Sequence, residues 1–304
     1  MKKKISWGKI LKGTVQSFSE DNVFKMSASL AYYTIFSMGP LLIIVISLVG
    51  IFYGRSAAEG EVYHQLRDLV GDKPAEQIQA IIQNLRNEDQ NWLHATIGVV
   101  VLIIGATTVF TQMQDSINII WRVKAKPKKG WVKFLKNRLL SFSLVISLGF
   151  LLLVSLIVSA VLDVFSEYLK AFLADYTVYL FYVINFAIIL AVISCLFAVI
   201  FKVLPDATIS WKDAFIGAAF TSLLFLLGKY GISIYLGQSD LSSTYGAAAS
   251  IIIILTWVYY SALILYFGAE FTRMYAITAG SGITPNDTAV YVIKRESKEI
   301  EPKN

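Results

Sequence analysis

The sequence predicts an all-α protein that crosses a lipid bilayer six times. Three observations favour this fold. Of the 304 residues, 56% are hydrophobic and only 16% are charged, whereas a soluble domain carries about 25% charged residues. Six runs reach the roughly 20 apolar residues that a helix needs to cross a hydrocarbon core of about 30 Å. Lysines and arginines concentrate in alternate segments between these runs.

The six apolar runs are each expected to form a helix, because lipid offers the backbone no hydrogen-bonding partners. Five runs contain no charged residue, and the fifth along the chain is interrupted only by Lys229. The predicted spans cover residues 30–54, 95–114, 139–162, 178–201, 214–236 and 247–269.

The distribution of basic residues predicts the orientation. Of the 27 lysines and arginines, 21 lie in four segments, namely residues 1–29, 122–138, 202–212 and 273–304. Cytoplasmic loops carry such an excess, so both termini are expected in the cytoplasm and the protein in the cytoplasmic membrane. The chain then divides into a basic amphipathic segment (1–29), a six-span membrane domain (30–272) and a partly disordered cytoplasmic tail (273–304).

Two polar segments have amphipathic patterns. In the N-terminal segment apolar residues recur at helical spacing, which favours an interfacial helix over a solvated basic tail. These residues are Trp7, Ile10, Leu11, Thr14, Val15 and Phe18. Asp21-Asn22 is expected to end this helix and cap the next one. The outer segment 55–94 predicts two short amphipathic helices, the second beginning after Pro74, which pack against the bundle or cover a cavity.

The loop 122–138 is strongly basic and contains aromatic residues. Nucleic-acid binding is one interpretation. Attraction to anionic lipid headgroups is favoured, because every predicted cytoplasmic segment has the same positive bias. Membrane lipids are therefore the expected partners, together with possible envelope proteins, and no nucleic-acid partner is expected. The candidate headgroup contacts are Lys124, Lys126, Lys128, Lys129, Lys133 and Lys136.

Polar side chains inside the spans are the candidates for a cavity or gate, because charge near the bilayer centre costs about 2.5–3.5 kcal/mol on insertion scales. Lys229 either faces a cavity or extends to the outer headgroups. Gly39-Pro40 is expected to break or kink the first span. The full candidate set is Gly39, Pro40, Gln112, Asp115, Asn118, Arg138, Asn185, Lys229, Tyr245 and Glu270.

A polar stripe ends the second span, where steps of three and four place its residues on one helix face. They are Thr108, Thr111, Gln112, Asp115, Asn118 and Arg122. Asp115 is expected to pair with Arg122 or Arg138, and Glu270 with Arg273 at the bundle rim. Small residues at multiples of four predict close helix contacts in the third span (Ser143 to Ser159) and in the fifth (Ala214, Ala218, Ser222).

Sequence motifs of hydrolases are missing. There is no Walker loop, GxSxG, HExxH or CxxC. One cysteine and two histidines leave little material for a metal centre. The protein is therefore expected not to be an enzyme and to need no metal or cofactor.

Several runs resemble the YihY/BrkB family of bacterial inner-membrane proteins. The first is Ser27–Pro40 and the second is Asp115–Trp121. Later landmarks are Leu204-Pro205, Trp211, Tyr245-Gly246, Trp257 and Gly268–Glu270. Met38-Gly39 departs from the bulkier residues typical before the proline. The resemblance covers roughly residues 10–275 and implies six spans with cytoplasmic termini. Labels such as "ribonuclease BN" and "virulence factor" in this family imply little about activity.

Three functional hypotheses follow. The leading one is transport or flipping of an anionic lipid, another amphiphile or an ion during envelope maintenance. It agrees with the lipid handling that the resemblance to the YihY/BrkB family implies. The second is a scaffold for envelope assembly that transports nothing. The third, a tRNA-processing nuclease using the loop 122–138, finds no hydrolytic residues to support it. The sequence does not specify an oligomeric state.

Overall fold

The structure is a computed structural model that describes residues 6–53, 60, 63, 67, 70–86, 108–126, 176–239, 241–245, 248–287 and 289–292. The helices are α1 (Trp7–Glu20), α2 (Val23–Tyr53), α4 (Asp72–Arg86), α7 (Tyr176–Val203), α8 (Trp211–Gln238), α9 (Leu241–Tyr245) and α10 (Ala249–Thr278). Residues 108–120 form a further helix. The strands are β1 (Val123–Ala125), β2 (Ala207–Thr208), β3 (Thr284–Pro285) and β4 (Ala289–Tyr291).

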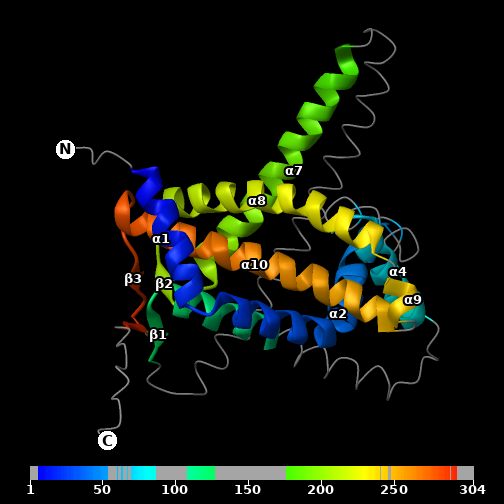
Figure 1. Cartoon of the computed structure of the whole chain (residues 1–304), viewed down its shortest axis with the longest axis horizontal. Coiled ribbons are helices and arrows are strands. Elements are labelled where there is room, and N and C mark those ends of the chain that lie inside the picture. Colours follow the sequence, from blue (N-terminus) through cyan, green and yellow to red (C-terminus); the bar gives the residue numbers. More distant parts are fainter. Residues whose placement is uncertain are drawn as a thin grey trace, which may run out of the picture.

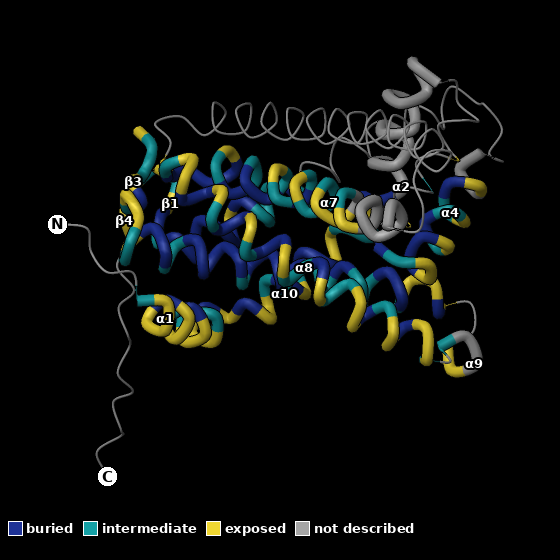
Figure 2. Tube along the Cα trace, turned by 90° about the horizontal axis from the view of Figure 1, so that it is seen from above, coloured by how far each residue is buried: buried dark blue, intermediate teal, exposed yellow. Residues whose placement is uncertain are grey.

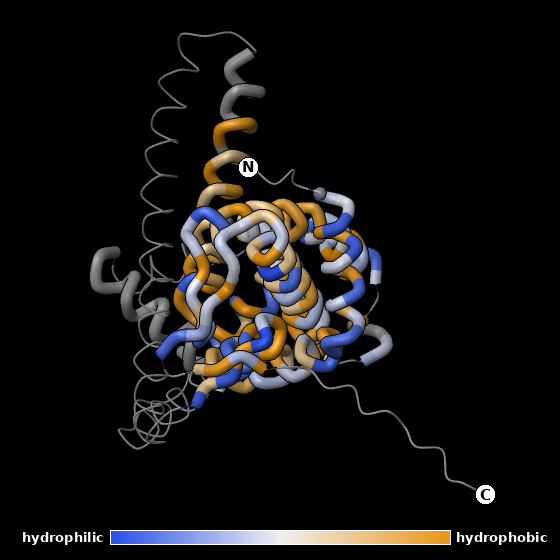
Figure 3. The backbone as a smooth tube through the Cα atoms, turned by 90° about the vertical axis from the view of Figure 1, so that its left-hand side faces the viewer, coloured by the Kyte–Doolittle hydropathy of each residue, from blue (hydrophilic) through white to orange (hydrophobic). Residues whose placement is uncertain are grey.

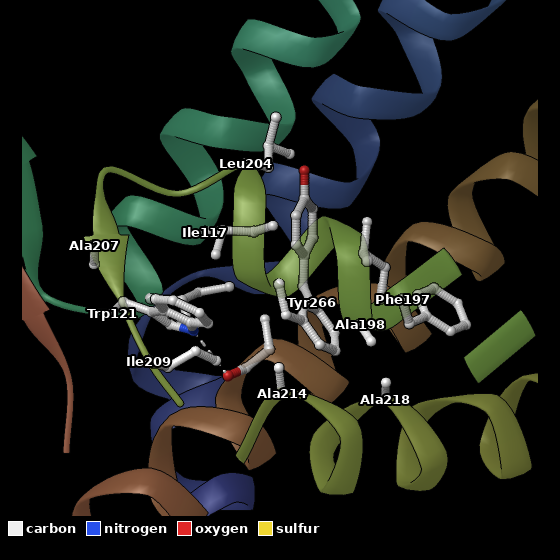
Figure 4. Packing of buried hydrophobic residues seen from close by; sticks show 14 of the residues in the cluster. Ile117, Trp121, Phe197, Ala198, Leu204, Ala207, Ile209, Ala214, Ala218 and Tyr266 are labelled. Atoms are coloured by element: carbon white, nitrogen blue, oxygen red, sulfur yellow. Dashed lines mark hydrogen bonds between the residues drawn. The ribbon is translucent and has the colours of Figure 1, made fainter. Parts of the chain in front are cut away.

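The long helix α10 lies at the centre of the bundle (Figure 1). It packs against α1, α2, α4, α8 and α9, while α7 packs against α8. Large side chains from three segments, Trp121, Phe201 and Tyr266, are almost completely buried in the main core. Figure 4 shows Trp121 and Tyr266 among their neighbours. The bundle is thus built around its last long helix.

Three of the described helices are long and apolar enough to cross a membrane: Phe186–Val203 within α7, the whole of α8 and the whole of α10. They match the predicted fourth, fifth and sixth spans. Figure 3 shows that the described turns of α7 projecting from the bundle are hydrophobic, as expected for a helix surface that lies in lipid.

The remaining predicted spans are described in part. Residues 30–53 of the first span lie inside the single helix α2, and Gly54 lies outside the described residues. Only the last residues of the second span, from 108 onward, are described, and they are helical. The third span, 139–162, lies outside the described residues together with its serine face. Six crossings therefore remain a prediction.

Helix α2 continues without interruption through Gly39-Pro40, so the predicted break does not occur. A proline removes one backbone donor from the ladder. The other hydrogen bonds of this 31-residue helix remain, and an apolar run in lipid gains nothing by opening them. The break after α1 is confirmed, because α1 ends before Asp21 and α2 starts at Val23.

The helices α8 and α10 approach closely through two reciprocal contacts. A side chain at Gly217 would overlap with Thr272, and one at Gly268 would overlap with Thr221. Each threonine hydroxyl donates to the glycine carbonyl four residues earlier, over 2.7 Å. The threonine hydroxyls are therefore satisfied within their own helices while the glycines admit the neighbouring helix. The predicted small face, Ala214, Ala218 and Ser222, is completely buried.

The two ends of the bundle contain different helices and strands (Figure 1). Helix α1 and all four strands lie at one end, which we call the α1 end; α4 and α9 lie at the other, the α4 end. β1 pairs with β4 and β2 with β3, both antiparallel. The described parts of the four segments with the basic excess thus lie at one end, in agreement with their predicted common side of the membrane.

Helix α1 buries one edge and exposes another (Figure 2). Ile10 is fully buried against Phe271, and the ring of Trp7 stacks 6.5 Å from that of Phe271. Leu11 and Val15 are exposed. An exposed apolar stripe on a basic helix is the pattern predicted for an interfacial segment.

Helix α4 confirms the second amphipathic helix of the outer segment. Its buried side chains Ile78 and Ile82 pack against Met38 of α2 and Ile254 of α10. Of the first such helix, only residues 60, 63, 67 and 70 are described, and they are helical. The packing of α4 against the bundle is the arrangement expected from the sequence.

Candidate functional site

The corner between α1 and α2 brings an acidic side chain into the bundle. Asn22 has a φ of 54°, in the left-handed region that asparagine tolerates better than most residues. Its carbonyl accepts the first backbone hydrogen bonds of α2, from Lys25 and Met26. The tight turn places Asp21 with only 4% of its surface exposed.

A second left-handed residue supplies the partner of this carboxylate. Arg122 follows the 108–120 helix with a φ of 58°, a conformation that costs about 1–3 kcal/mol outside glycine. Its Nη1 donates to Asp21 Oδ1 over 2.8 Å. The backbone carbonyl of Arg122 accepts a hydrogen bond from Val292, next to β4. The structure thus gives Arg122 a partner other than Asp115.

A third charged residue, Glu270 of α10, lies behind this pair and is completely buried. Its Oε2 is 3.5 Å from Arg273 Nη1, so the predicted pair is confirmed, although inside the bundle rather than at its rim. Asp21, Arg122 and Arg273 are charged neighbours of Glu270. We call Asp21, Arg122, Glu270 and Arg273 the buried charge cluster.

The buried charge cluster is held by neighbouring core contacts. Trp121 Nε1 donates to the carbonyl of Ala269 over 3.2 Å (Figure 4). These residues directly precede Arg122 and Glu270, so one hydrogen bond fixes the distance between the two charged positions. Asp21 and Glu270 are buried, whereas Arg122 and Arg273 are partly buried. Buried acidic groups are costly, and pairing them with arginines is weak support for a role in stability alone. Such groups inside a membrane protein indicate a functional site.

A second buried polar contact links the 108–120 helix to the turn after α7. Asn118 Nδ2 donates to Asp206 Oδ2 over 3.0 Å, and the backbone N–H of Asp206 donates to Asn118 Oδ1 over 2.8 Å. Both side chains are buried. Sequence reasoning missed Asp206, although a carboxylate directly after Leu204-Pro205 at the end of an apolar run was a usable signal.

A pocket of about 670 Å³ opens beside the buried charge cluster. It is lined by Glu20, Asp21, Asn22, Asp115, Asn118, Ile119, Arg122, Val123, Lys124, Ala125 and Val292. Asp21 and Arg122 belong to both the pocket wall and the cluster. An opening at the surface and a set of buried charges are therefore continuous at the α1 end.

Comparison with known proteins places the chain in a family. The family model described as "Virulence factor BrkB" matches residues 14–289. This chain belongs to the BrkB family. No solved structure matches it.

The relatives of this BrkB-family protein are named UPF0761 membrane proteins. That of Pseudoalteromonas atlantica is 24% identical over 290 residues, which cover 90% of this chain and 92% of the relative. That of Aeromonas salmonicida is 27% identical over 261 residues, which cover 84% of this chain and 84% of the relative. That of Alcanivorax borkumensis is 27% identical over 85% of this chain, which spans only 58% of the relative's length. This BrkB-family chain is therefore a membrane protein.

The predicted site residues of the BrkB-family protein separate into two groups. Asp115, Asn118 and Lys124 line the pocket. Gln112 lies one turn earlier on the same helix, with Nε2 3.4 Å from Ser116 Oγ. Lys126 is exposed beyond β1. The later residues of the polar stripe, Asp115, Asn118 and Arg122, thus line the pocket.

Lys229 and Tyr245 are not among the residues that line this pocket. Lys229 is half-buried one turn before Ser233, against which Gly71 packs near the start of α4. Tyr245 is exposed at the end of α9. A side chain added at Gly228 would overlap with Tyr260, whereas one at Gly231 would meet open space.

Other predicted residues cannot be placed. The side chains of Gly39, Pro40 and Asn185 lie outside the described residues, although their helices are described. Arg138, Lys128, Lys129, Lys133 and Lys136 lie outside the described residues altogether. Within the described part of the chain, no group of three or more His, Cys, Asp or Glu residues is arranged to hold a metal ion.

Proposed function

We propose that this BrkB-family membrane protein transports a phosphate-bearing amphiphile, such as a phospholipid, across the cytoplasmic membrane. The headgroup enters at the pocket of the α1 end, which faces the cytoplasm. One observation carries the proposal: Asp21 and Arg122 both line an open pocket and belong to a charge cluster buried in a bundle of membrane-spanning helices.

The cytoplasmic placement of the pocket is supported by charge. The four segments whose described parts lie at the α1 end carry most of the lysines and arginines of the chain. Positive residues are retained on the cytoplasmic side during insertion, and anionic lipids of that leaflet attract them. Exposed Leu11 and Val15 on α1 add an apolar contact at the same membrane surface.

The phosphate group has two candidate ligands in the pocket wall, Arg122 and Lys124. A guanidinium carries five donors in a planar fork that matches phosphate oxygens. The hydrogen bond to Asp21 uses Nη1 of Arg122. A phosphate that competes with Asp21 for this guanidinium loosens the cluster, because Asp21 also neighbours Glu270. This competition is the first event of the proposed transport.

A flipping assay tests the proposal. Purified protein is reconstituted into vesicles containing acyl-labelled phospholipids, and the rate at which label leaves the dithionite-accessible leaflet is compared with that of protein-free vesicles. We expect faster exchange with the parent protein, reduced by Arg122→Lys, which keeps the charge but not the fork. Lys126→Ala is the matched control, because Lys126 is exposed and does not line the pocket. No exchange of any phospholipid would overturn the proposal, and stable co-purification of an envelope protein would then favour a scaffold.

A further inference from the structure

We infer that Glu270 is a proton-binding site, and that its proton controls the access of a lipid phosphate to Arg122. The second part of this inference rests on the function proposed above and names the ion that is coupled to transport. The inference is carried by the burial of Glu270 and by its contact with Asp21.

Glu270 is a buried carboxyl group to which no other group donates a hydrogen bond. It is completely buried, and neither of its oxygens accepts a hydrogen bond among the described residues. Its Oε2 is 3.5 Å from Arg273 Nη1, too long for a charge-assisted hydrogen bond. An ionised carboxylate in this setting has lost its water without gaining hydrogen bonds, whereas a neutral carboxyl group avoids much of that cost. The site can therefore hold a proton.

The contact between Glu270 and Asp21 needs a hydrogen atom. The two carboxyl groups lie within reach of a side-chain hydrogen bond. Two ionised carboxylates have no hydrogen to place between them, and they repel each other. One proton on Glu270 turns the contact into an O–H···O⁻ hydrogen bond, which is short and strong. Asp21 would then accept hydrogen bonds from both Glu270 and Arg122.

The charged neighbours of Glu270 come from three segments. Asp21 follows α1, Arg122 follows the 108–120 helix, and Arg273 lies on α10. The buried Asp213 of α8 instead bonds to the turn after α10. The lysines of α1 are exposed. Other titratable side chains described at this end are exposed or are tyrosines, namely Glu20, Lys25, Asp115, Lys212, Tyr266 and Tyr275.

Arg122 connects this carboxyl pair to the pocket, because it binds Asp21 and also lines the pocket wall. When Glu270 is ionised, two carboxylates attract the guanidinium of Arg122. When Glu270 is protonated, that attraction is weaker and its O–H supplies Asp21 with a hydrogen bond, so Arg122 turns to a phosphate at a lower cost. The direction does not depend on what else Asp21 contacts, because only Glu270 changes its charge. By reciprocity, phosphate at Arg122 strengthens proton binding at Glu270.

The pH dependence of flipping tests the coupling. The assay described above is run with an acyl-labelled lipid that carries a glycerol headgroup, whose phosphodiester stays ionised between about pH 9 and about pH 6, as do exposed carboxyl groups. With the parent protein we expect the rate to rise about tenfold as the pH is lowered over this range. Glu270→Gln is permanently neutral and still donates to Asp21, so its rate should stay high throughout. Asp287→Asn, an exposed position outside the pocket, is the matched control and should keep the parent profile.

Infrared difference spectra detect the proton independently of transport. Between the same two pH values, the parent protein should gain the carbonyl stretching band of a protonated carboxyl group, because exposed carboxyl groups stay ionised. Soluble glycerophosphoglycerol, added at the higher pH, should increase this band. Both measurements need only the parent protein, so they apply even if Glu270→Gln does not fold. In folded Glu270→Gln the band should be missing.

The outcomes separate the proton site from the transport. The inference would be overturned by a parent protein without the band, by a band that glycerophosphoglycerol does not change or that Glu270→Gln keeps, or by a flipping rate that is independent of pH in the parent or follows the parent profile in Glu270→Gln. Each of these results leaves the proposed transport intact. Absence of flipping at every pH would overturn the proposed function, while a band that is lost in Glu270→Gln would still identify the proton-binding site.

Discussion

The α1 end and the α4 end each contain an ion pair, but in opposite surroundings. At the α4 end Arg67 and Asp72 form a pair whose side chains are 52% and 68% exposed. At the α1 end the Arg122–Asp21 pair is 21% and 1% exposed. Water screens the first pair, so it contributes about 0–1 kcal/mol. The second lies where removing one partner leaves a buried charge.

The packing of the two ends differs in the same way. Aliphatic side chains such as Ile78 and Ile82 join α4 to the bundle. At the α1 end polar contacts add to the apolar packing of α1 on α10, including the Asn118–Asp206 pair and two short strand pairs. Apolar contacts tolerate adjustment, whereas buried polar networks are costly when partly satisfied. The comparison indicates that the α4 end mainly holds the bundle together and the α1 end carries the specific chemistry.

The largest expected effect is the loss of Arg122. Arg122→Ala leaves Asp21 without its hydrogen-bond donor beside Glu270, and breaking such a buried pair costs about 3–5 kcal/mol. Arg67→Ala at the α4 end is the matched variant, with an expected loss below about 1 kcal/mol. Thermal unfolding in detergent, followed by size-exclusion chromatography, measures both. Similar losses for the two variants would contradict the contrast between the ends.

A smaller effect is expected along α8, which runs from one end to the other. Gly217→Ala places a methyl group against Thr272, and overpacking of this kind costs about 1–3 kcal/mol. Gly231→Ala on the same helix meets open space and is expected to be neutral or to stabilise by up to about 1 kcal/mol. The same unfolding measurement applies. A destabilising Gly231→Ala together with a neutral Gly217→Ala would show that α8 and α10 do not pack as described.

Long apolar elements were predictable from the sequence, because the thickness of the bilayer fixes how many residues a span needs. The helices α7, α8 and α10 lie over their predicted spans. The break at Asp21-Asn22 was predictable from local capping chemistry. Of the two outcomes predicted for Gly39-Pro40, a break is not seen, because one missing donor does not end a helix in an apolar setting, and a kink stays a prediction. The strands were missed since two or three residues carry no measurable alternation.

The candidate site was predictable only in part, for a different reason. The spacing of the polar stripe identified Asp115 and Asn118, because helix periodicity is local. The partners of the stripe are remote: Arg122 binds Asp21 across 101 positions, and Asn118 binds Asp206 across 88. No spacing rule connects such residues. Lys229 satisfied the same criterion of a polar group in a span, yet it lies toward the α4 end.

The Asn118–Asp206 pair allows a finer test of the polar end. Single and double alanine variants at these positions form a thermodynamic cycle, and residues in direct contact show coupling of about 0.5–3 kcal/mol. Gln79→Ala is the control at the α4 end. Its Oε1 is buried and accepts no hydrogen bond among the described residues, so its loss is expected to cost less than that of Asn118. Additive effects of Asn118→Ala and Asp206→Ala would refute a direct contact.

Cysteine labelling tests the orientation of the two ends in the membrane. The substitutions that it needs are expected to change stability least. The chain has a single cysteine, Cys195, which is exposed. In a Cys195→Ser background, Glu76→Cys marks α4 and Asp287→Cys marks the turn between β3 and β4. A membrane-impermeant maleimide added to intact spheroplasts should label the first and should reach the second only after the membrane is opened. Because both positions lie at the surface, neither substitution is expected to change stability by more than about 0.5 kcal/mol. The reverse labelling pattern would place the pocket outside the cell, where the headgroup could not enter from the cytoplasmic leaflet. Labelling of both cysteines in intact spheroplasts would mean that the two ends do not lie on opposite sides of the membrane.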